Sequence, residues 1–508
     1  MTYKIFPDLK SKLKIISEKR KKGKKIVLCH GAFDLVHPGH LDHLKKAKSL
    51  GDILIVTITG DNFMKKNLHS PYFNENVRLK YLEQIKIIDY AFRLNSYDAT
   101  LAIKTFKPDF YCKGKEYKDS DSLGNLEKEK RALRSIGGKI KFLGNNIQSS
   151  SKLISEEFFA INDSTIKSNL SKISFNDIEN IFKKIEKLKV LIIGETIIDK
   201  YLFVSTKGIS PKSNTLSCTV SEEHTMPGGA LASYNFLSSF IKNTSLISII
   251  NANLMLEKKV KKLFSNRVKP IISKNYNKIV KKRVVEKEVD KRIKKIITIN
   301  DFENKPLSIN DEKVIIKKLN ILLPKSDIVI VQDFGHNLFS NKIRNLIQNK
   351  SKFLSINVQT NSLNYGFNII DKKYSKANMF TLDEKELELC ASKKNLNHLS
   401  ELKKLFNILN SENSFLTCGG KFSLALNKKN YYKIPTLNNN AIDSVGAGDI
   451  FHCMSSVISK VTKNLFLNLL ISQISGALAV NILGNSGYPK INEILKTLKY
   501  YKDSLRNN

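Results

Sequence analysis

The chain contains no tryptophan, and acidic residues are scarce: 47 Asp and Glu stand against 85 Lys and Arg, for a formal net charge of +38 in 508 residues. Nucleic-acid grooves usually combine basic side chains with aromatic ones on which bases stack. Here the lysines are spread along the whole chain and few aromatic residues lie in the basic stretches. We therefore interpret the charge as a solvated Lys-rich surface, so nucleic acid is not the expected partner.

Cysteines are few and contain no C-x-x-C pair, which argues against a disulfide framework and against a thiolate zinc site. There is no signal-peptide core near the start and no apolar run close to the about 20 residues of a membrane helix. We therefore expect a cytoplasmic chain without membrane contact. Its length exceeds what one hydrophobic core usually organises, so we expect two to four domains. The six cysteines are Cys29, Cys112, Cys218, Cys390, Cys418 and Cys453.

The first informative segment follows a short apolar strand predicted at Lys25–His30. Pro38 is typical of the first position of a helix, which we expect to run to Leu50 and to stop at Gly51. The segment that begins after the strand and runs into the helix reads Gly31-Ala32-Phe33-Asp34-Leu35-Val36-His37-Pro38-Gly39-His40.

Strands and helices are predicted to alternate after this segment, which indicates a parallel sheet. In such sheets ligands bind at the carboxyl ends of the strands, where the loop that begins at Gly31 lies. The further predicted elements are strands at Ile53–Thr59, Phe110–Lys113 and Lys139–Leu143 and helices at Val77–Ile88 and Leu126–Ile136.

His37 and His40 lie three residues apart around a helix start, so both can face one ligand. Imidazole N–H groups and helix N-terminal amides stabilise charge that builds on an α-phosphate and a pyrophosphate during in-line attack. Gly39 lets the backbone approach a nucleotide closely. This chemistry predicts transfer of a nucleotidyl group, with His37 and His40 as the catalytic residues.

These residues match in full the signature G-x-F-D-x-x-H-x-G-H, and residues 24–155 resemble the cytidylyltransferase-like nucleotidyltransferases. The resemblance implies a Rossmann-like domain over residues 1–155. It also implies that the following residues contact the nucleotide: Gly31, Ala32, Phe33, Asp34, Gly39, Asp61, Arg78, Lys113, Ser149, Ser150, Ser151 and Lys152.

Residues 156–187 are polar and rich in Lys, Asn and Ser, and we expect a linker with helical patches. A new strand is predicted at Val190–Ile193, and residues 188–508 are assigned to a second α/β domain. The basic stretch Lys258–Lys295 alternates in places as edge strands do. The other strands of this domain are predicted at Ile328–Gln332, Phe353–Asn357, Met379–Thr381 and Phe415–Thr417.

The second informative segment is Asp443-Ser444-Val445-Gly446-Ala447-Gly448-Asp449, directly before a helix predicted at Ile450–Ile458. Its glycines let backbone amides approach a phosphate at a helix N-terminus. Asp449, as catalytic base, would accept the proton of a substrate hydroxyl that attacks a γ-phosphoryl group, with Mg²⁺ neutralising the phosphates.

This segment resembles the signature D-[ST]-x-G-A-G-D of ribokinase-like sugar kinases, and residues 188–500 look like that family, which has an α/β fold with a small β lid. The resemblance implies nucleotide contacts from Thr417, Gly419, Gly446, Ala447 and Gly448. It implies substrate contacts from Asp199, Gly228, Gly229, Lys281 and Arg283.

Together the two segments resemble the bifunctional heptose 7-phosphate kinase and heptose 1-phosphate adenylyltransferase family, in reversed domain order. That resemblance implies synthesis of a nucleotide-activated sugar from ATP, or CTP, and a sugar phosphate. Several kinase positions depart from the family pattern: Ala232 stands for an Asn near the sugar, Asn357-Val358-Gln359 for Asp-Pro-Lys, Leu382-Asp383 for Pro-Asn, and Phe422 for a turn glycine.

Two other functions are open. A cytidylyltransferase for glycerol phosphate or another polyol phosphate, with a degenerate kinase domain, would have the same first segment. A tRNA-related protein is disfavoured, because class I aminoacyl-tRNA synthetases need a longer catalytic domain and a Lys-Met-Ser-Lys-Ser loop. The choice of base, the sugar, the activity of the kinase half and a homo-oligomeric state are not determined by the sequence.

Overall fold

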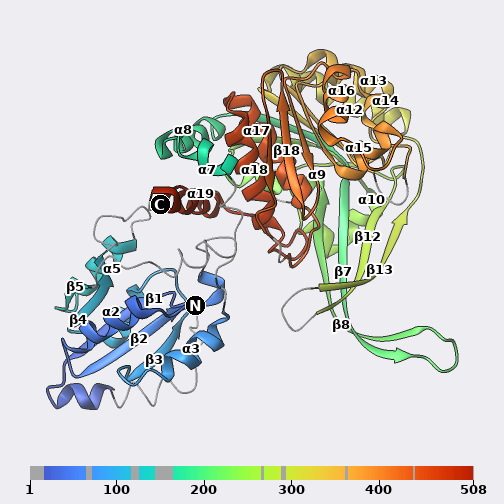
Figure 1. Cartoon of the computed structure of the whole chain (residues 1–508). Coiled ribbons are helices and arrows are strands. Elements are labelled where there is room, and N and C mark those ends of the chain that lie inside the picture. Colours follow the sequence, from blue (N-terminus) through green and yellow to red (C-terminus); the bar gives the residue numbers. More distant parts are fainter. Residues whose placement is uncertain are drawn as a thin grey trace. The chain divides into compact units, whose positions relative to one another are not determined.

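The computed structural model describes residues 16–64, 71, 73–115, 125–143, 164–264, 268–287, 293–360, 364–438 and 441–506. The chain divides into two compact units, Met1–Phe159 and Ala160–Asn508 (Figure 1). Residues assigned above to a linker form two helices that belong to the second unit, α7 (Ser164–Leu170) and α8 (Phe175–Ile185).

The first unit contains a five-stranded sheet with the order β3-β2-β1-β4-β5, in which every neighbouring pair is parallel. The chain reverses its direction across the sheet between β1 and β4, and this switch point is where ligands bind in open α/β sheets. The expected parallel sheet is confirmed. The strands are β1 (Ile26–Gly31), β2 (Ile53–Thr59), β3 (Tyr90–Leu94), β4 (Phe110–Gly114) and β5 (Lys139–Leu143).

Helices cover both faces of this sheet. Leu44, Ala47 and Leu82 pack on one face, and Ala102, Ile103 and Leu133 pack on the other. Because β1 and β2 are buried on both faces, their residues form almost continuous apolar runs. The helices are α2 (Pro38–Lys48), the short 3₁₀ helix η1 (Asp61–Phe63), α3 (Glu75–Glu83), α4 (Thr100–Phe106) and α5 (Asn125–Arg134).

The main sheet of the second unit has the order β19-β18-β17-β16-β15-β14-β6-β9. The strands from β17 to β9 run parallel, whereas β18 and β19 are antiparallel. The strands are β6 (Lys189–Gly194), β9 (Asn243–Ile247), β14 (Ile328–Asp333), β15 (Leu354–Val358), β16 (Met379–Asp383), β17 (Asn413–Thr417), β18 (Phe422–Asn427) and β19 (Tyr431–Pro435).

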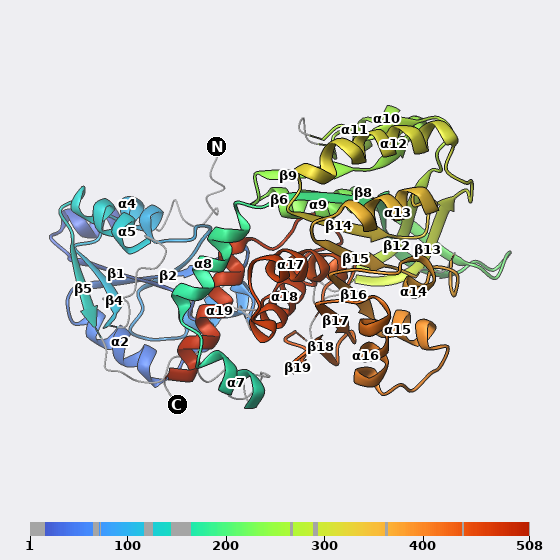
Figure 2. The same ribbon diagram turned by 90° about the horizontal axis from the view of Figure 1, so that it is seen from above.

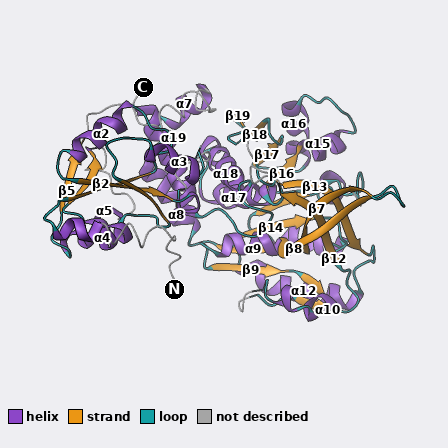
Figure 3. Ribbon diagram, turned by 90° about the horizontal axis from the view of Figure 1, so that it is seen from below, coloured by secondary structure: helices purple, strands orange, loops and turns teal. Residues whose placement is uncertain are grey.

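A separate sheet with the order β13-β12-β7-β8 projects from this unit and fits the expected small β lid (Figure 3). β12 pairs with β7 on one side and β13 on the other, so the expectation of a basic edge strand is wrong for Lys281–Arg283. The strands are β7 (Thr196–Ile209), β8 (Leu216–Gly229), β12 (Ile279–Lys287) and β13 (Ile293–Phe302); β10 (Ile249–Asn251) and β11 (Ile271–Ser273) pair elsewhere.

Helices lie on both faces of the main sheet, with α9, α17 and α18 on one face and α12, α13, α15 and α16 on the other (Figure 2). Within the described residues, we find no helix with the length and apolar character needed to span a membrane. The remaining helices are α9 (Ala230–Ser238), α10 (Ala252–Leu256), α11 (Lys258–Lys261), α12 (Ile309–Leu322), η4 (Leu323–Lys325), α13 (Asn341–Lys350), α14 (Ile370–Lys373), α15 (Glu384–Ala391), α16 (His398–Ile408), α17 (Ala447–Val461), α18 (Leu465–Ala479) and α19 (Ile491–Arg506).

Candidate active sites

The first candidate site lies where β1 ends and α2 begins. His37 is the N-cap of α2, and its Nδ1 accepts the backbone N–H of Gly39 at 3.1 Å. The ring centroid of His40 lies 4.1 Å from that of His37. The structure therefore brings the two rings together beside the helix N-terminus, and their catalytic role stays a prediction.

The hydrogen bond from Gly39 determines the tautomer of neutral His37. Because Nδ1 is the acceptor, the ring proton lies on Nε2, which can then donate to a ligand. The first turn of α2 has no acidic residue, and its backbone amides favour an anion. The local chemistry therefore suits a phosphate group.

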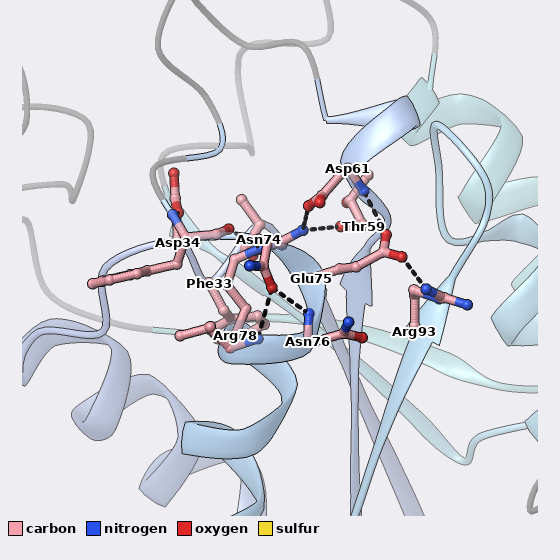
Figure 4. Close-up of polar contacts among 12 residues, drawn as sticks. Phe33, Asp34, Thr59, Asp61, Asn74, Glu75, Asn76, Arg78 and Arg93 are labelled. Atoms are coloured by element: carbon pink, nitrogen blue, oxygen red, sulfur yellow. Dashed lines mark hydrogen bonds and ion pairs between the residues drawn. The ribbon is translucent and has the colours of Figure 1, made fainter. Parts of the chain in front are cut away.

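Arg78 differs from the expected phosphate contact, because its side chain has no exposed surface. It donates to the carbonyls of Ala32, Thr59 and Phe73 and to the carboxylate of Asp61, at 2.6–2.9 Å (Figure 4). Its guanidinium thus joins the loop after β1, the end of β2 and the segment before α3. Arg78 is a positioning residue that holds the loop of the site in place.

The side chains at the centre of this loop are also used within the protein. Asp34 is 4 % exposed and accepts the N–H of Phe73 at 2.9 Å. The Tyr81 hydroxyl donates to the carbonyls of Phe33 and, at 2.7 Å, Asp34. A Cβ at Gly31 would lie 3.1 Å from the Phe33 ring. The nucleotide contacts expected of Gly31, Ala32, Phe33 and Asp34 stay predictions.

Asp61 and Lys113 are both held by ion pairs. Asp61 pairs with Arg78 at 2.9 Å, and its N–H donates to Glu75 at 2.8 Å. The Nζ of Lys113 lies 2.5 Å from the carboxylate of Glu129, which is 2 % exposed. Their expected nucleotide contacts stay predictions. Ser149, Ser150, Ser151 and Lys152 lie outside the described residues.

The second candidate site is centred on Asp449, in the first turn of α17. Gln359 donates to its Oδ1 at 2.6 Å. Burial raises the pKa of Asp449 to about 6, although Gln359 and the positive charge of Lys281 act in the opposite direction. Its surface is partly open to solvent. A carboxylate with this pKa can take up a proton near neutral pH.

Charged residues from the separate sheet lie close to this carboxylate. Asp199 on β7 forms an ion pair with Arg283 on β12, and Lys281 is the register partner of Asp199. Burial lowers the pKa of Lys281, whereas Asp199 and Asp449 act to raise it. The structure thus brings together four of the residues singled out by the sequence.

Gly228 and Gly229 lie where β8 meets α9, and both are sterically constrained. A Cβ at Gly228 would be 2.6 Å from the carboxylate of Asp199. Gly229 has a φ of +57°, and its Cβ would meet a backbone carbonyl at 2.4 Å. Gly229 therefore requires glycine, and the absence of a side chain at Gly228 leaves room for the carboxylate of Asp199.

A pocket of about 400 Å³ opens beside these glycines. Its wall includes Ile450, the residue after Asp449, and Pro227, the residue before Gly228. The pocket therefore adjoins both the start of α17, which carries Asp449, and the end of β8, which carries Gly228. Other side chains in the wall are Met226, Ala232, Asn235 and Tyr488.

The glycine-containing loop before α17 has a backbone that a phosphate could approach closely. Gly446 has a φ of +82°, and a Cβ there would meet the Asn485 side chain at 2.1 Å. Ala447 begins the helix, and no described atom comes within 4 Å of a Cβ placed at Gly448. The helix N-terminus is therefore open at Gly448, which suits a phosphate.

Asp443 anchors this loop. It accepts the hydroxyl of Tyr201 at 2.5 Å and the N–H of Gly484 at 3.0 Å, and it pairs with Lys295 at 2.9 Å. Burial raises the pKa of Tyr201, so its hydroxyl remains a donor. The start of the loop is consequently tied to both the separate sheet and the segment that follows α18.

Thr417 and Gly419 lie at the carboxyl end of β17, on the edge of the main sheet that also carries Gln359 after β15. Gly419 has a φ of +51° in the turn toward β18. Parallel strands place their carboxyl ends along one edge, where ligands bind. The nucleotide contacts of Thr417 and Gly419 stay predictions.

Comparison with protein families gives two matches. Residues 28–168 match the family model described as cytidylyltransferase-like, and residues 187–464 match that of the pfkB family carbohydrate kinases. The second match covers more than half of the chain. The chain belongs to the pfkB family of carbohydrate kinases. The predicted order of a nucleotidyltransferase-like domain followed by a sugar kinase domain is confirmed.

Curated relatives resemble the first unit. "Bifunctional protein HldE" of Desulfatibacillum aliphaticivorans is 32 % identical over 135 residues, which are 26 % of this chain and 26 % of that protein. The protein of the same name from Helicobacter pylori is 34 % identical over 123 residues, 24 % of this chain and 27 % of that protein. The matched segment thus spans about a quarter of the length of these relatives.

Solved structures resemble the pfkB part of the chain. Ribokinase from Thermotoga maritima has 19 % identity and a TM-score of 0.45, covering 61 % of this chain and 99 % of that structure. Phosphofructokinase-2 from Escherichia coli in complex with potassium has 12 % identity and a TM-score of 0.49, covering 62 % of this chain and 99 % of that structure.

Residues at which the chain departs from the pattern of sugar kinases have structural partners of their own. Asn357 donates to the carbonyl of Thr381 at 3.0 Å. Gln359, in place of a Lys, bonds Asp449. Asp383 caps α15 in a capping box with Glu386. These replacements therefore stabilise the edge of the sheet beside Asp449.

Sequence reasoning missed Asn74 and Asn485, and it noted Gln359 only as a departure from the sugar-kinase pattern. Asn74, the N-cap of α3, accepts two backbone N–H groups, and an N-cap rule would have moved the helix start from Val77 to Glu75. Gln359 and Asn485 had no comparable signal, because their partners Asp449 and Asp199 lie 90 and 286 residues away.

Proposed function

We propose that the chain synthesises a nucleotide-activated sugar, with the first unit transferring an adenylyl group from ATP to a heptose 1-phosphate. The observation that carries this proposal is the pair of imidazole rings of His37 and His40, 4.1 Å apart at the N-terminus of α2. Relatives that share the first unit bear the name "bifunctional protein", which supports a chain with two activities.

In the proposed transfer, an oxygen of the sugar 1-phosphate attacks the α-phosphorus of ATP, and pyrophosphate leaves. His37 Nε2–H and the ring of His40 donate hydrogen bonds to the oxygens on which negative charge builds. Backbone amides at the start of α2 hold the same charge. Arg78 and Tyr81 act indirectly, because they fix the loop that precedes His37.

We propose that the second unit phosphorylates a sugar phosphate with ATP. Asp449 accepts the proton of the attacking hydroxyl, and the amides around Gly448 hold the phosphates. Lys281 and Arg283 would bind the anionic end of the sugar phosphate. When bound, Mg²⁺ neutralises the phosphate charge. The carboxylate of Glu386, which interacts electrostatically with Asp449, is an oxygen donor that would hold it.

The pocket whose wall includes Ile450 and Ala232 supports a proposed change of sugar specificity. Ala232 lines it where the heptose kinases carry an Asn. Each hydrogen bond lost to a buried polar group costs about 1–3 kcal/mol, so recognition of the usual heptose would weaken unless Asn235, on the same wall, replaces it. The acceptor in the kinase step is therefore proposed as a sugar phosphate of modified structure.

A second candidate for the first unit is cytidylyl transfer to glycerol phosphate or another polyol phosphate. The match to the cytidylyltransferase-like family model favours it, since that description applies to residues 28–168. This candidate requires CTP and needs no working kinase.

The test is to incubate the full chain with each of the four nucleoside triphosphates and a panel of sugar phosphates and polyol phosphates, and to identify products by mass. We expect an ADP-sugar and pyrophosphate from ATP and a heptose 1-phosphate. A CDP-polyol as the sole product would replace this proposal by the second candidate. No nucleotide-linked product from any pair would refute both.

A further inference from the structure

A cluster of three different metal-binding side chains lies on the second unit, separate from Asp449. The carboxylate of Glu384, the imidazole of His398 and the thiol of Cys418 have ligand atoms that all lie within 4.8 Å of one another. His398 Nε2 is 2.9 Å from Glu384 Oε1. No motif reveals this group, because its members come from three different elements of the fold.

The backbone around each member is fixed. Glu384 is the first residue of α15, held by the capping box of Asp383, and His398 is the first residue of α16, capped by Asn397. Cys418 follows β17 directly, and its N–H donates to the carbonyl of Phe422 at 2.9 Å. Only side-chain rotation is therefore needed to bring the ligand atoms closer.

Accessibility also suits a bound ion. The Cys418 residue is 2 % exposed, whereas the side chains of Glu384 and His398 are 27 % and 26 % exposed. His398 also lines a second pocket, of about 270 Å³. An ion could enter from the solvent side, where a water could complete its coordination.

We propose that Glu384, His398 and Cys418 form a binding site for a divalent transition metal of the zinc type, with one position left for water. Tetrahedral zinc takes thiolate, imidazole and carboxylate ligands at about 2.0–2.3 Å, so its ligand atoms are about 3.3–3.7 Å apart. The 2.9 Å contact would widen slightly, and the thiol would move inward.

Binding exchanges a proton for the metal. The S–H bond of Cys418 breaks, its electron pair forms the sulfur–metal bond, and the proton goes to the solvent. Proton release into the solvent should therefore accompany binding. No electron transfer is involved.

The ammonium group of Lys421 competes with a metal ion for the carboxylate of Glu384. Its Nζ lies 3.0 Å from Glu384 Oε2, and its side chain is 67 % exposed, so the ammonium can move into solvent when a metal takes its place. The site would join the turn of Cys418, which lies between Thr417 and Gly419, to α15 and α16. Metal binding would thus fix the turn predicted to contact the nucleotide.

The experiment uses the metal-free full chain titrated with Co²⁺ in the absence of nucleotide. We expect a thiolate-to-cobalt charge-transfer band that saturates at one equivalent and disappears when Zn²⁺ is added. Cys418→Ser should lose the band, and Glu384→Gln and His398→Gln should weaken binding at least about 10-fold. Lys421→Met should strengthen it, an effect that a purely structural cluster would not produce.

Cys390→Ser is the matched control, because Cys390 lies on α15 outside the cluster and should leave the band unchanged. Thermal unfolding in EDTA establishes that each variant is folded before titration. A band that survives Cys418→Ser, a band that depends on Cys390, or no saturation at one equivalent in the wild-type chain would overturn the proposal.

Discussion

The two candidate sites use the same device, a glycine-containing loop that enters a helix N-terminus, but they assemble their side chains differently. In the first, His37 and His40 come from one loop and one helix start. In the second, Asp449 meets Gln359 from the end of β15 and Lys281 from the separate sheet. A site built from one segment is readable as a motif, whereas a site built from several depends on the packing of the fold.

The two sites also differ in the buried polar groups that surround their functional residues. Arg78 is buried, and its four side-chain hydrogen bonds join the loop after β1 to the end of β2 and to the segment before α3. In the second site the carboxylate itself lacks such a set of donors, and burial raises its pKa to about 6. The first site thus has a buried cation that fixes its loop, whereas the proposed base of the second site has a raised pKa.

The largest effect is expected from Asp449→Asn. Because the amide cannot accept the hydroxyl proton, sugar phosphorylation should fall by about 10²–10⁴-fold, while nucleotidyl transfer by the other unit continues. Coupled ADP release measures the kinase step. Asp301→Asn, at an exposed position on β13, is the control. An equal loss of phosphorylation rate in both variants would show that Asp449 is not the catalytic base.

His37→Ala and His40→Ala should each lower nucleotidyl transfer by about 10²–10³-fold, as expected for removal of one donor to developing charge. Pyrophosphate release with ATP and the sugar 1-phosphate is the measurement. His224→Ala, an exposed position in the second unit, should leave the rate unchanged. Wild-type rates in folded His37 and His40 variants would contradict the proposed role of the rings.

Arg78→Lys should destabilise the first unit, because an ammonium cannot reach the four acceptors that the planar guanidinium bonds. Each unsatisfied buried acceptor costs about 1–3 kcal/mol. Calorimetry of the full chain should show that the unfolding transition of the first unit shifts to lower temperature, while that of the second unit stays unchanged. Arg93→Lys, at a partly exposed ion pair with Glu75, is the control and should have a smaller effect.

The kinase rate should depend on pH through Asp449. Its raised pKa, about 6, means that the carboxylate is protonated and inactive as a base below that pH. We expect kcat/KM for phosphorylation to rise about tenfold per pH unit up to about pH 6 and then to level off. A profile that is flat across this range would mean that another group accepts the proton.

The smallest effect is expected from Gln359→Leu. Loss of its hydrogen bond removes an interaction that lowers the pKa of Asp449, so the acidic limb of the profile should move to higher pH. The plateau rate should change only a few-fold. Gln348 is a buried glutamine on α13, and the Gln348→Leu variant tests whether a general loss of stability also shifts the acidic limb. A shift in both variants would argue against a specific contact.

Much of the fold followed from local pattern. The strands Ile53–Thr59 and Lys139–Leu143 have the predicted bounds. Tyr90–Leu94 and Thr100–Phe106 were missed: β3 is a short edge strand of mixed burial, and α4 has only seven residues. Short or half-buried elements lack the long periodic signal on which such predictions depend.

The sequence by itself predicted which residues contact phosphate, because each of the two glycine-containing segments carries its chemistry within ten residues or fewer. It could not determine which polar side chains support them. Arg78 bonds Asp61, Gln359 bonds Asp449, and Asn485 bonds Asp199 only because the packed fold brings segments distant in sequence together. Tertiary structure decided these partnerships, since hydrogen bonds and ion pairs depend on distance in space rather than along the chain.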